Sequence, residues 1–96
     1  MVRENAVEKR LVDGVKRLGG KALKFIPTAC KGMPDRLVLL PAGRAIWVEL
    51  KADGGVLSPM QVKRLDELEA LGFDTYVLEG AGMVEEFLKG ISNGSI

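Results

Sequence analysis

The fold is decided by residues 32–51, which read GMPDRLVLLPAGRAIWVELK. Residues 35–40 and 45–51 are each of strand length and contain the apolar runs 37–40 and 45–48, and such runs predict β-strands. The Pro-Ala-Gly segment between the runs favours a tight turn, and the turn-prone Gly-Met-Pro segment precedes the first run. We therefore predict a hairpin in which the start of one strand, near Asp35, meets the end of the other, near Lys51.

The segments on either side of this hairpin carry helical and extended patterns in turn. Helices are predicted over residues 4–18, 58–71 and 83–88, and further strands over residues 22–26, ending at Pro27, and 74–78. Short connections between three successive strands favour antiparallel pairing, whereas the long helix before the last strand favours a parallel crossover. We expect an α/β domain of the order αβββαβα, with a mixed four-stranded sheet flanked by helices.

The overall composition indicates one compact globular domain. The chain has 96 residues, of which 47% are hydrophobic and 28% charged, and this balance excludes disorder and collagen-like structure. Its longest apolar stretch falls far short of the roughly 18 residues that a membrane-spanning helix needs, and no secretory signal is visible. We expect a domain over residues 1–91, a flexible tail over residues 92–96, no membrane partner and a cytoplasmic location.

Histidine is absent from the chain, and this absence excludes several kinds of active site. Serine and cysteine nucleophiles activated by histidine are ruled out, and so is zinc held by histidine. The single cysteine, Cys30, cannot form an internal disulfide, and we interpret it as a small buried residue. Any catalysis must therefore rely on carboxylates and lysine, with or without a hard metal ion.

Charge is distributed unevenly along the chain, although the net charge is only +1. Residues 1–48 hold ten Lys or Arg against four Asp or Glu, whereas residues 49–96 hold four against nine. The basic half is compatible with a surface that faces phosphates. Solvated helix faces of unequal charge account for the same numbers, so both interpretations stay open.

The end of the second hairpin strand combines a carboxylate with an ammonium group. Because residues two apart share a face of a strand, Trp47, Glu49 and Lys51 point the same way. If Asp35 lies about 4 Å from Glu49, the two carboxylates repel by roughly 4 kcal/mol at an effective dielectric constant of 20. Protonation, a lysine or a divalent cation would relieve that repulsion. With a divalent cation, these groups can hydrolyse a phosphodiester.

The order of these residues resembles a known nuclease signature. Gly32-Met-Pro-Asp35 followed by Glu49-Leu-Lys51 is similar to the PD-(D/E)XK motif. Leu57-Ser-Pro-Met-Gln61, the glycine that ends the next helix and the strand after it resemble the VRR-NUC (virus-type replication-repair nuclease) branch. The similarity extends from Glu8 through Leu88, as in a standalone phage or bacterial member with no appended domain. It implies a restriction-endonuclease-like core and a bacterial cell or a phage-infected host.

The resemblance also implies roles for individual residues. Asp35 and Glu49 would coordinate Mg²⁺ or Mn²⁺ together with the backbone carbonyl of Leu50. Lys51 would be the catalytic lysine. Glu8, on the first helix, would contact the metal through water or bind a second ion.

Some of these residues have structural interpretations as well. Gln61 would orient Lys51 or a phosphate, but with Ser58 it also fits a helix capping box, as Glu8 does with Asn5. Lys31 and Arg36 flank the acidic residues and are candidate phosphate contacts, although a solvated surface is nearly as good an interpretation.

The function implied is a metal-dependent, structure-specific DNA endonuclease. A chain this small offers little surface for a branched DNA, so we expect a homodimer that cuts four-way (Holliday) junctions, with one active site for each symmetric strand. The alternatives are a flap or nonspecific nuclease for DNA repair or phage DNA processing, and a non-catalytic DNA-binding subunit.

Overall fold

The computed structural model describes residues 4–26 and 29–96 of the chain, so the predicted strand end at Pro27 lies outside the described residues. The elements follow the predicted order: α1 (Glu4–Arg17), β1 (Lys21–Lys24), β2 (Arg36–Leu40), the short 3-10 turn η1 (Pro41–Gly43), β3 (Arg44–Lys51), α2 (Pro59–Ala70), β4 (Asp74–Glu79) and α3 (Gly80–Asn93). β2 pairs antiparallel with β1 and β3, and β4 joins β3 in parallel. The predicted mixed four-stranded sheet is confirmed, with the strand order β1-β2-β3-β4.

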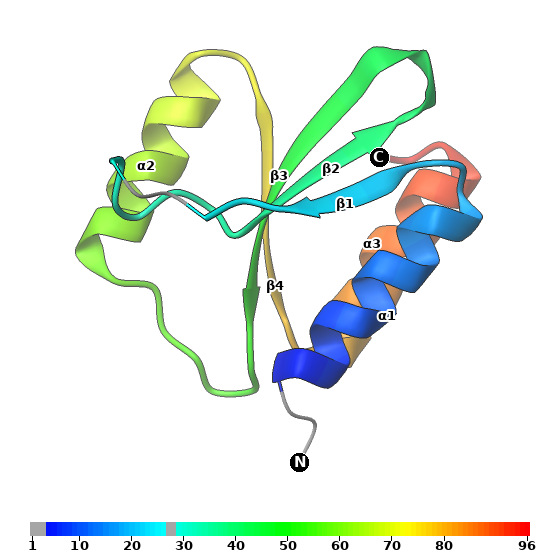
Figure 1. Cartoon of the computed structure of the whole chain (residues 1–96), viewed down its shortest axis with the longest axis horizontal. Coiled ribbons are helices and arrows are strands. Elements are labelled where there is room, and N and C mark those ends of the chain that lie inside the picture. The colour runs from blue at the N-terminus through cyan, green and yellow to red at the C-terminus, as the bar shows by residue number, and fades with distance from the viewer. Residues whose placement is uncertain (1–3, 27–28) are drawn as a thin grey trace.

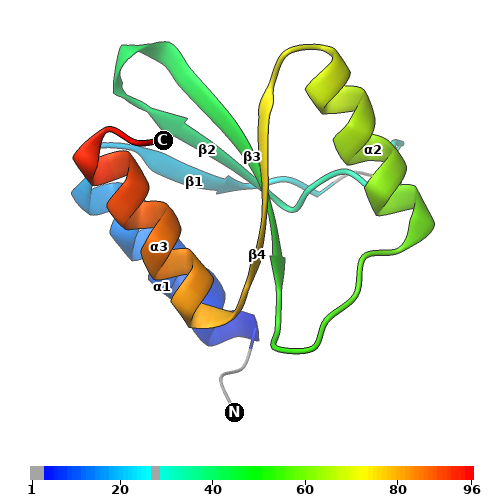
Figure 2. The same cartoon turned by 180° about the vertical axis from the view of Figure 1, so that it is seen from behind.

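The helices form layers on both sides of this sheet. α1 and α3 lie side by side on one face, and α2 lies on the other (Figures 1 and 2). α2 connects the end of β3 to the start of β4 and so makes the parallel crossover (Figure 1). No helix in the described ranges is long and apolar enough to cross a membrane.

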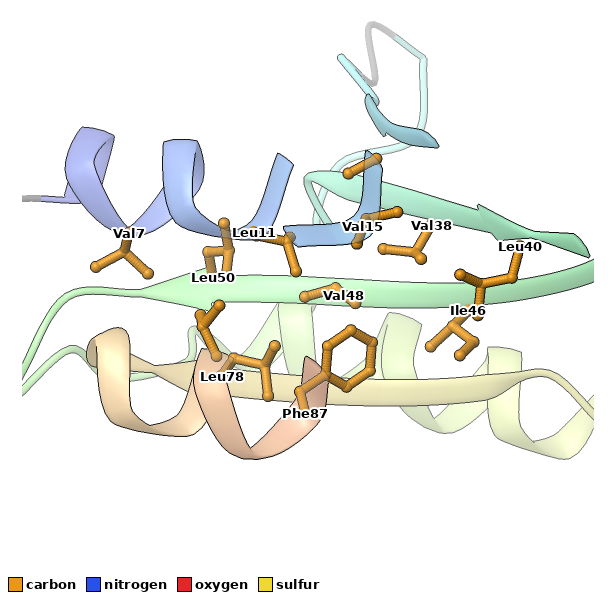
Figure 3. Packing of buried hydrophobic residues seen from close by; sticks show 12 residues of the cluster. Val7, Leu11, Val15, Val38, Leu40, Ile46, Val48, Leu50, Leu78 and Phe87 are labelled. Atoms are coloured by element: carbon orange, nitrogen blue, oxygen red, sulfur yellow. The ribbon is translucent and has the colours of Figure 1, made fainter. Parts of the chain in front are cut away.

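The central strand β3 fixes the register of the hairpin through the core. Ile46, Val48 and Leu50 are fully buried on the face covered by α1 and α3. Figure 3 shows Val48 and Leu50 between the apolar side chains of α1 and Phe87 of α3. Burying each such side chain is worth about 1.5–3 kcal/mol. A slip by one residue would expose all three and turn Glu49 into the core, so the core itself sets where the acidic residues lie.

The last helix is longer than the predicted span of 83–88, because its glycines do not interrupt it. Gly80 begins α3 with a φ of 76°, a left-handed conformation suited to the sharp turn from β4. Gly90 is buried, and a Cβ on it would collide with Ile96. The expected tail at residues 92–96 therefore includes the end of α3. Ile96 packs against the core, and its carbonyl accepts a hydrogen bond from Arg44 Nη1 at 3.0 Å.

Candidate functional site

The hairpin brings Asp35 to the end of β3, in agreement with the predicted pairing. The register sets Arg36 opposite Val48, so Asp35, one residue earlier, stands level with Glu49. Asp35 Oδ1 accepts a hydrogen bond from the backbone N–H of Leu50 at 3.2 Å. The Asp35 carboxyl group is therefore hydrogen-bonded directly to the backbone of the Glu49-Leu-Lys51 segment.

The backbone before Asp35 is held from two sides. Gly32 has a φ of 84°, and a Cβ placed on it would lie 2.7 Å from the carbonyl oxygen of Met60 in the first turn of α2. Asp35 itself accepts a hydrogen bond at its backbone carbonyl from the N–H of Phe25 at 2.8 Å. Close packing against α2 and this link to the chain after β1 together fix the position from which Asp35 projects.

Glu49 is buried in spite of its charge, and it lies beside polar groups from two elements. Its side chain is only 7% exposed, and Lys51 Nζ lies 3.8 Å from its Oε2 atom. Gln61 Nε2 donates a hydrogen bond to the same oxygen at 3.3 Å. Burial of a carboxylate costs free energy unless polar partners compensate for the lost water. Lys51 and Gln61 provide such partners for Glu49.

Gln61 performs two tasks with one side-chain amide. Its Oε1 atom accepts from the N–H of Ser58 at 2.8 Å, while Ser58 Oγ accepts from the N–H of Gln61 at 3.2 Å. This reciprocal pair is the predicted capping box at the start of α2. The remaining Nε2 group donates to Glu49, a contact that was not among the expected ones to Lys51 or a phosphate. The structural and the functional interpretations of Gln61 therefore coexist.

The environment of Asp35 raises the pKa of its carboxyl group. Burial is the main cause that raises the pKa of this carboxyl group above its usual value, and the negative charge of Glu8 adds to the effect. The hydrogen bond from the Leu50 N–H and the positive charge of Arg36 act in the opposite direction. A cation beside Asp35 would relieve this cost.

Glu8 and Arg36 face each other at the edge of the site. Arg36 Nη2 lies 3.8 Å from Glu8 Oε2, and Arg36 Nη1 donates to the backbone carbonyl of Ala22 at 3.1 Å. The Arg36 side chain is only 12% exposed, so its guanidinium is turned inward. The capping box proposed for Asn5 and Glu8 is not formed, because α1 already includes Asn5 as a helical residue.

The segment before Asp35 contains one contact that the sequence analysis did not identify. Arg64 Nε donates to the backbone carbonyl of Lys31 at 2.8 Å, which ties this segment to α2. The signal available in the sequence was the three-residue spacing from Gln61, which places Arg64 on a neighbouring part of the same helix face. The Lys31 side chain is exposed, whereas Cys30 is half-buried rather than fully buried as expected.

Side-chain carboxylates alone do not form a complete metal cage here. Within residues 4–26 and 29–96, no three His, Cys, Asp or Glu side chains lie close enough together to hold a metal ion. Asp35 and Glu49 would therefore need other oxygen donors, such as a backbone carbonyl and water.

Comparisons with known proteins find relatives of this chain, and the family match includes the β2–β3 hairpin and the helices α1 and α2. The family model described as the VRR-NUC domain matches residues 1–82. A protein of Acyrthosiphon pisum secondary endosymbiont phage 1, named "Putative nuclease p44", is 44% identical over 79 residues, which cover 82% of this chain and 85% of that protein.

Two solved structures share the architecture. A structure named "VRR_NUC domain" superposes with a TM-score of 0.85 at 26% identity and covers 93% of this chain and 97% of its own. A "VRR_NUC domain protein" shares the fold at 20% identity, with a TM-score of 0.69, over 97% of this chain and 88% of its own. On the family match and the phage relative, the chain belongs to the VRR-NUC family of nuclease domains.

Proposed function

We propose that this domain is a metal-dependent DNA endonuclease of the PD-(D/E)XK type, which hydrolyses phosphodiester bonds. The observation that carries the proposal is the hydrogen bond from the Leu50 N–H to Asp35, because it unites the start of β2 with the Glu49–Lys51 end of β3. Family membership supports nuclease activity in general. The pair of carboxylates with a lysine supports this chemistry in particular.

A divalent ion fits the oxygen donors at this end of the sheet. In an extended strand the N–H and C=O of one residue point to the same side, so the Leu50 carbonyl faces the same way as the N–H that binds Asp35. If the β2–β3 register continues by two residues, Pro34 stands opposite Leu50 and offers that carbonyl no N–H. Two carboxylates and a backbone carbonyl match the preference of Mg²⁺ and Mn²⁺ for oxygen ligands.

The other residues of the site have distinct roles in this proposal. When bound, the ion would lower the pKa of the attacking water and offset charge on the phosphate. Lys51, 3.8 Å from Glu49, would position or deprotonate that water or neutralise charge at the phosphorus atom. Gln61 would keep Glu49 in its ligating orientation through the 3.3 Å hydrogen bond. Lys31 would contact a phosphate of the DNA with its exposed ammonium group.

The substrate we propose is a four-way junction cut by a homodimer. A twofold dimer presents two equal active sites to the two symmetric strands of such a junction. An exposed apolar surface supports association: Leu23 and Leu39 are 46% and 36% exposed on the sheet face that α1 and α3 leave uncovered. On the same face, Trp47 packs edge-on against Phe25, with ring centroids 5.2 Å apart.

The test is cleavage of labelled four-way, flap, nicked and linear DNA, with and without Mg²⁺ or Mn²⁺, by the native chain and by D35N as the inactive control. We expect metal-dependent cutting of the four-way junction and no cutting by D35N. Equal cutting of linear duplex would remove the junction specificity, and preferred cutting of flaps would favour the repair or phage-processing alternative. If no substrate is cut and calorimetry detects no Mn²⁺ binding, the non-catalytic DNA-binding alternative holds instead.

A further inference from the structure

A mostly buried cation, the Arg36 side chain, lies directly beside the proposed metal site. Arg36 follows Asp35 in the chain, and its side chain is 12% exposed. Burying a guanidinium requires partners, and Arg36 finds them in Ala22, whose backbone carbonyl lies 3.1 Å from Nη1, and Glu8, whose carboxylate lies 3.8 Å from Nη2. Its Nε atom is buried without a hydrogen-bond partner among the described residues. These contacts fix the position of the Arg36 guanidinium, although the unsatisfied Nε atom costs folding free energy.

The anchoring of Arg36 does not depend on Glu8. Because Nη1 is bonded to a backbone carbonyl of β1, the sheet itself holds the positive charge next to α1. Glu8, on α1, then meets a cation that is already in place. The Glu8 side chain is 24% exposed, so it is not forced into this position by close packing. Attraction to the positive charge of Arg36 explains its orientation.

The positive and negative side-chain charges around the site nearly cancel in the absence of a metal ion. The carboxylates are Glu8, Asp35 and Glu49, and the cations are Arg36, paired with Glu8, and Lys51, paired with Glu49. These five groups leave a net charge of one negative unit. One divalent ion reverses the sign of that charge. A second ion would add two further positive charges and would need a carboxylate that Arg36 already occupies.

We infer that each chain binds a single divalent ion, and that Arg36 takes the place that a second ion would otherwise occupy beside Glu8. The inference rests on the proposed function, since it concerns the same site. Arg36 is on this account a positioning residue: it holds Glu8 away from the ion and supplies a fixed positive charge. Glu8 is then not a ligand of the ion that Asp35 and Glu49 bind.

The experiment counts Mn²⁺ ions per chain by electron paramagnetic resonance of free Mn²⁺, with circular dichroism to confirm folding. The native chain should bind one ion, and D35N none at this site. Arg36→Met and Arg36→Gln should each bind two, because Glu8 is released, whereas Arg36→Lys, which keeps the charge, should bind one. The double variant R36M/E8Q should return to one ion.

Glu8→Gln gives a test that does not disturb the buried arginine. It should still bind one ion, with a dissociation constant within about tenfold of the native value, because its carboxylate is not a ligand. A greater loss of affinity in E8Q would overturn the inference even if the Arg36 variants fail to fold. One ion in folded R36M and R36Q would overturn it too.

The count for the native chain separates this inference from the proposed function. Two ions lost together in D35N would overturn the single-ion inference and leave the metal-dependent nuclease in place. No bound ion would overturn the proposed function, and the inference with it.

Discussion

Gly32→Ala tests whether the packing before β2 positions Asp35, the carboxylate that we propose binds the metal. The added Cβ would lie 2.5 Å from Met60 Cγ, 2.7 Å from the Met60 carbonyl oxygen and 2.8 Å from its carbonyl carbon. The methionine side chain can move away, but the backbone of the first turn of α2 cannot do so without disturbing the helix. The alanine must also adopt the φ of 84° that the glycine has here.

Two contributions add to the cost of this substitution. The left-handed backbone conformation costs an alanine about 1–2 kcal/mol. The collision with α2 should cost about 1–3 kcal/mol more, in the range found for overpacked sites. Gly72→Ala is the matched control, since Gly72 has a φ of 92° but no atom within 4 Å of its Cβ position. The difference between the two variants isolates the collision.

The assay is thermal unfolding of both variants, followed by junction cleavage and Mn²⁺ titration. For a domain of this size, 1 kcal/mol corresponds to about 4–8 °C in Tm, so Gly32→Ala should melt at least about 4 °C below Gly72→Ala. It should also bind Mn²⁺ more weakly, because Asp35 lies three residues after Gly32. Equal melting temperatures would refute the contact with α2. A lower Tm with native Mn²⁺ affinity would refute the idea that this contact positions Asp35.

Further variants probe the other residues of the site. Asp35→Asn should abolish cleavage yet raise the Tm in metal-free buffer at pH 7. Because burial raises the pKa of Asp35 in the folded chain, its charge costs stability above that pKa, and the advantage of the variant should vanish as the pH falls below the usual value of 3.8; an advantage that persists at pH 3 would contradict this origin. Lys51→Ala should lose cleavage and keep native circular dichroism, and full activity would falsify the role given to Lys51. Gln61→Ala and Ser58→Ala should each cost about 0.5–2 kcal/mol through loss of the cap, measured by urea unfolding. Gln61→Ala should weaken Mn²⁺ binding more than Ser58→Ala does, because Gln61 donates a hydrogen bond to Glu49 whereas Ser58 acts on Glu49 only through the cap, and equal binding by both variants would remove that direct link.

The sequence predicts the hairpin well because local pattern and global packing agree there. The alternation through Ile46, Val48 and Leu50 selects the buried face of β3, and that choice also sets the direction of Glu49. The turn residues determine where β2 begins. Together these features are sufficient to bring Asp35 level with Glu49 without further information on the fold.

The parts that the sequence did not predict depend on contacts between distant elements. The pairing of Arg36 with Glu8 requires the position of α1 over the sheet, which no local pattern specifies. The predicted helix over residues 83–88 is shorter than α3, which extends from Gly80 to Asn93. In the folded chain Gly80 makes the turn out of β4, and Gly90 makes room for Ile96. Tertiary packing outweighs helix propensity at both positions.

The shared amide of Gln61 couples the stability of the first turn of α2 to the position of Glu49. The side chain that closes the first turn of α2 also steadies Glu49, so fraying at that helix terminus would release the buried carboxylate at the same moment. Substitutions that unwind this terminus, even those that never touch the reacting groups, should therefore inactivate the enzyme well before they unfold it.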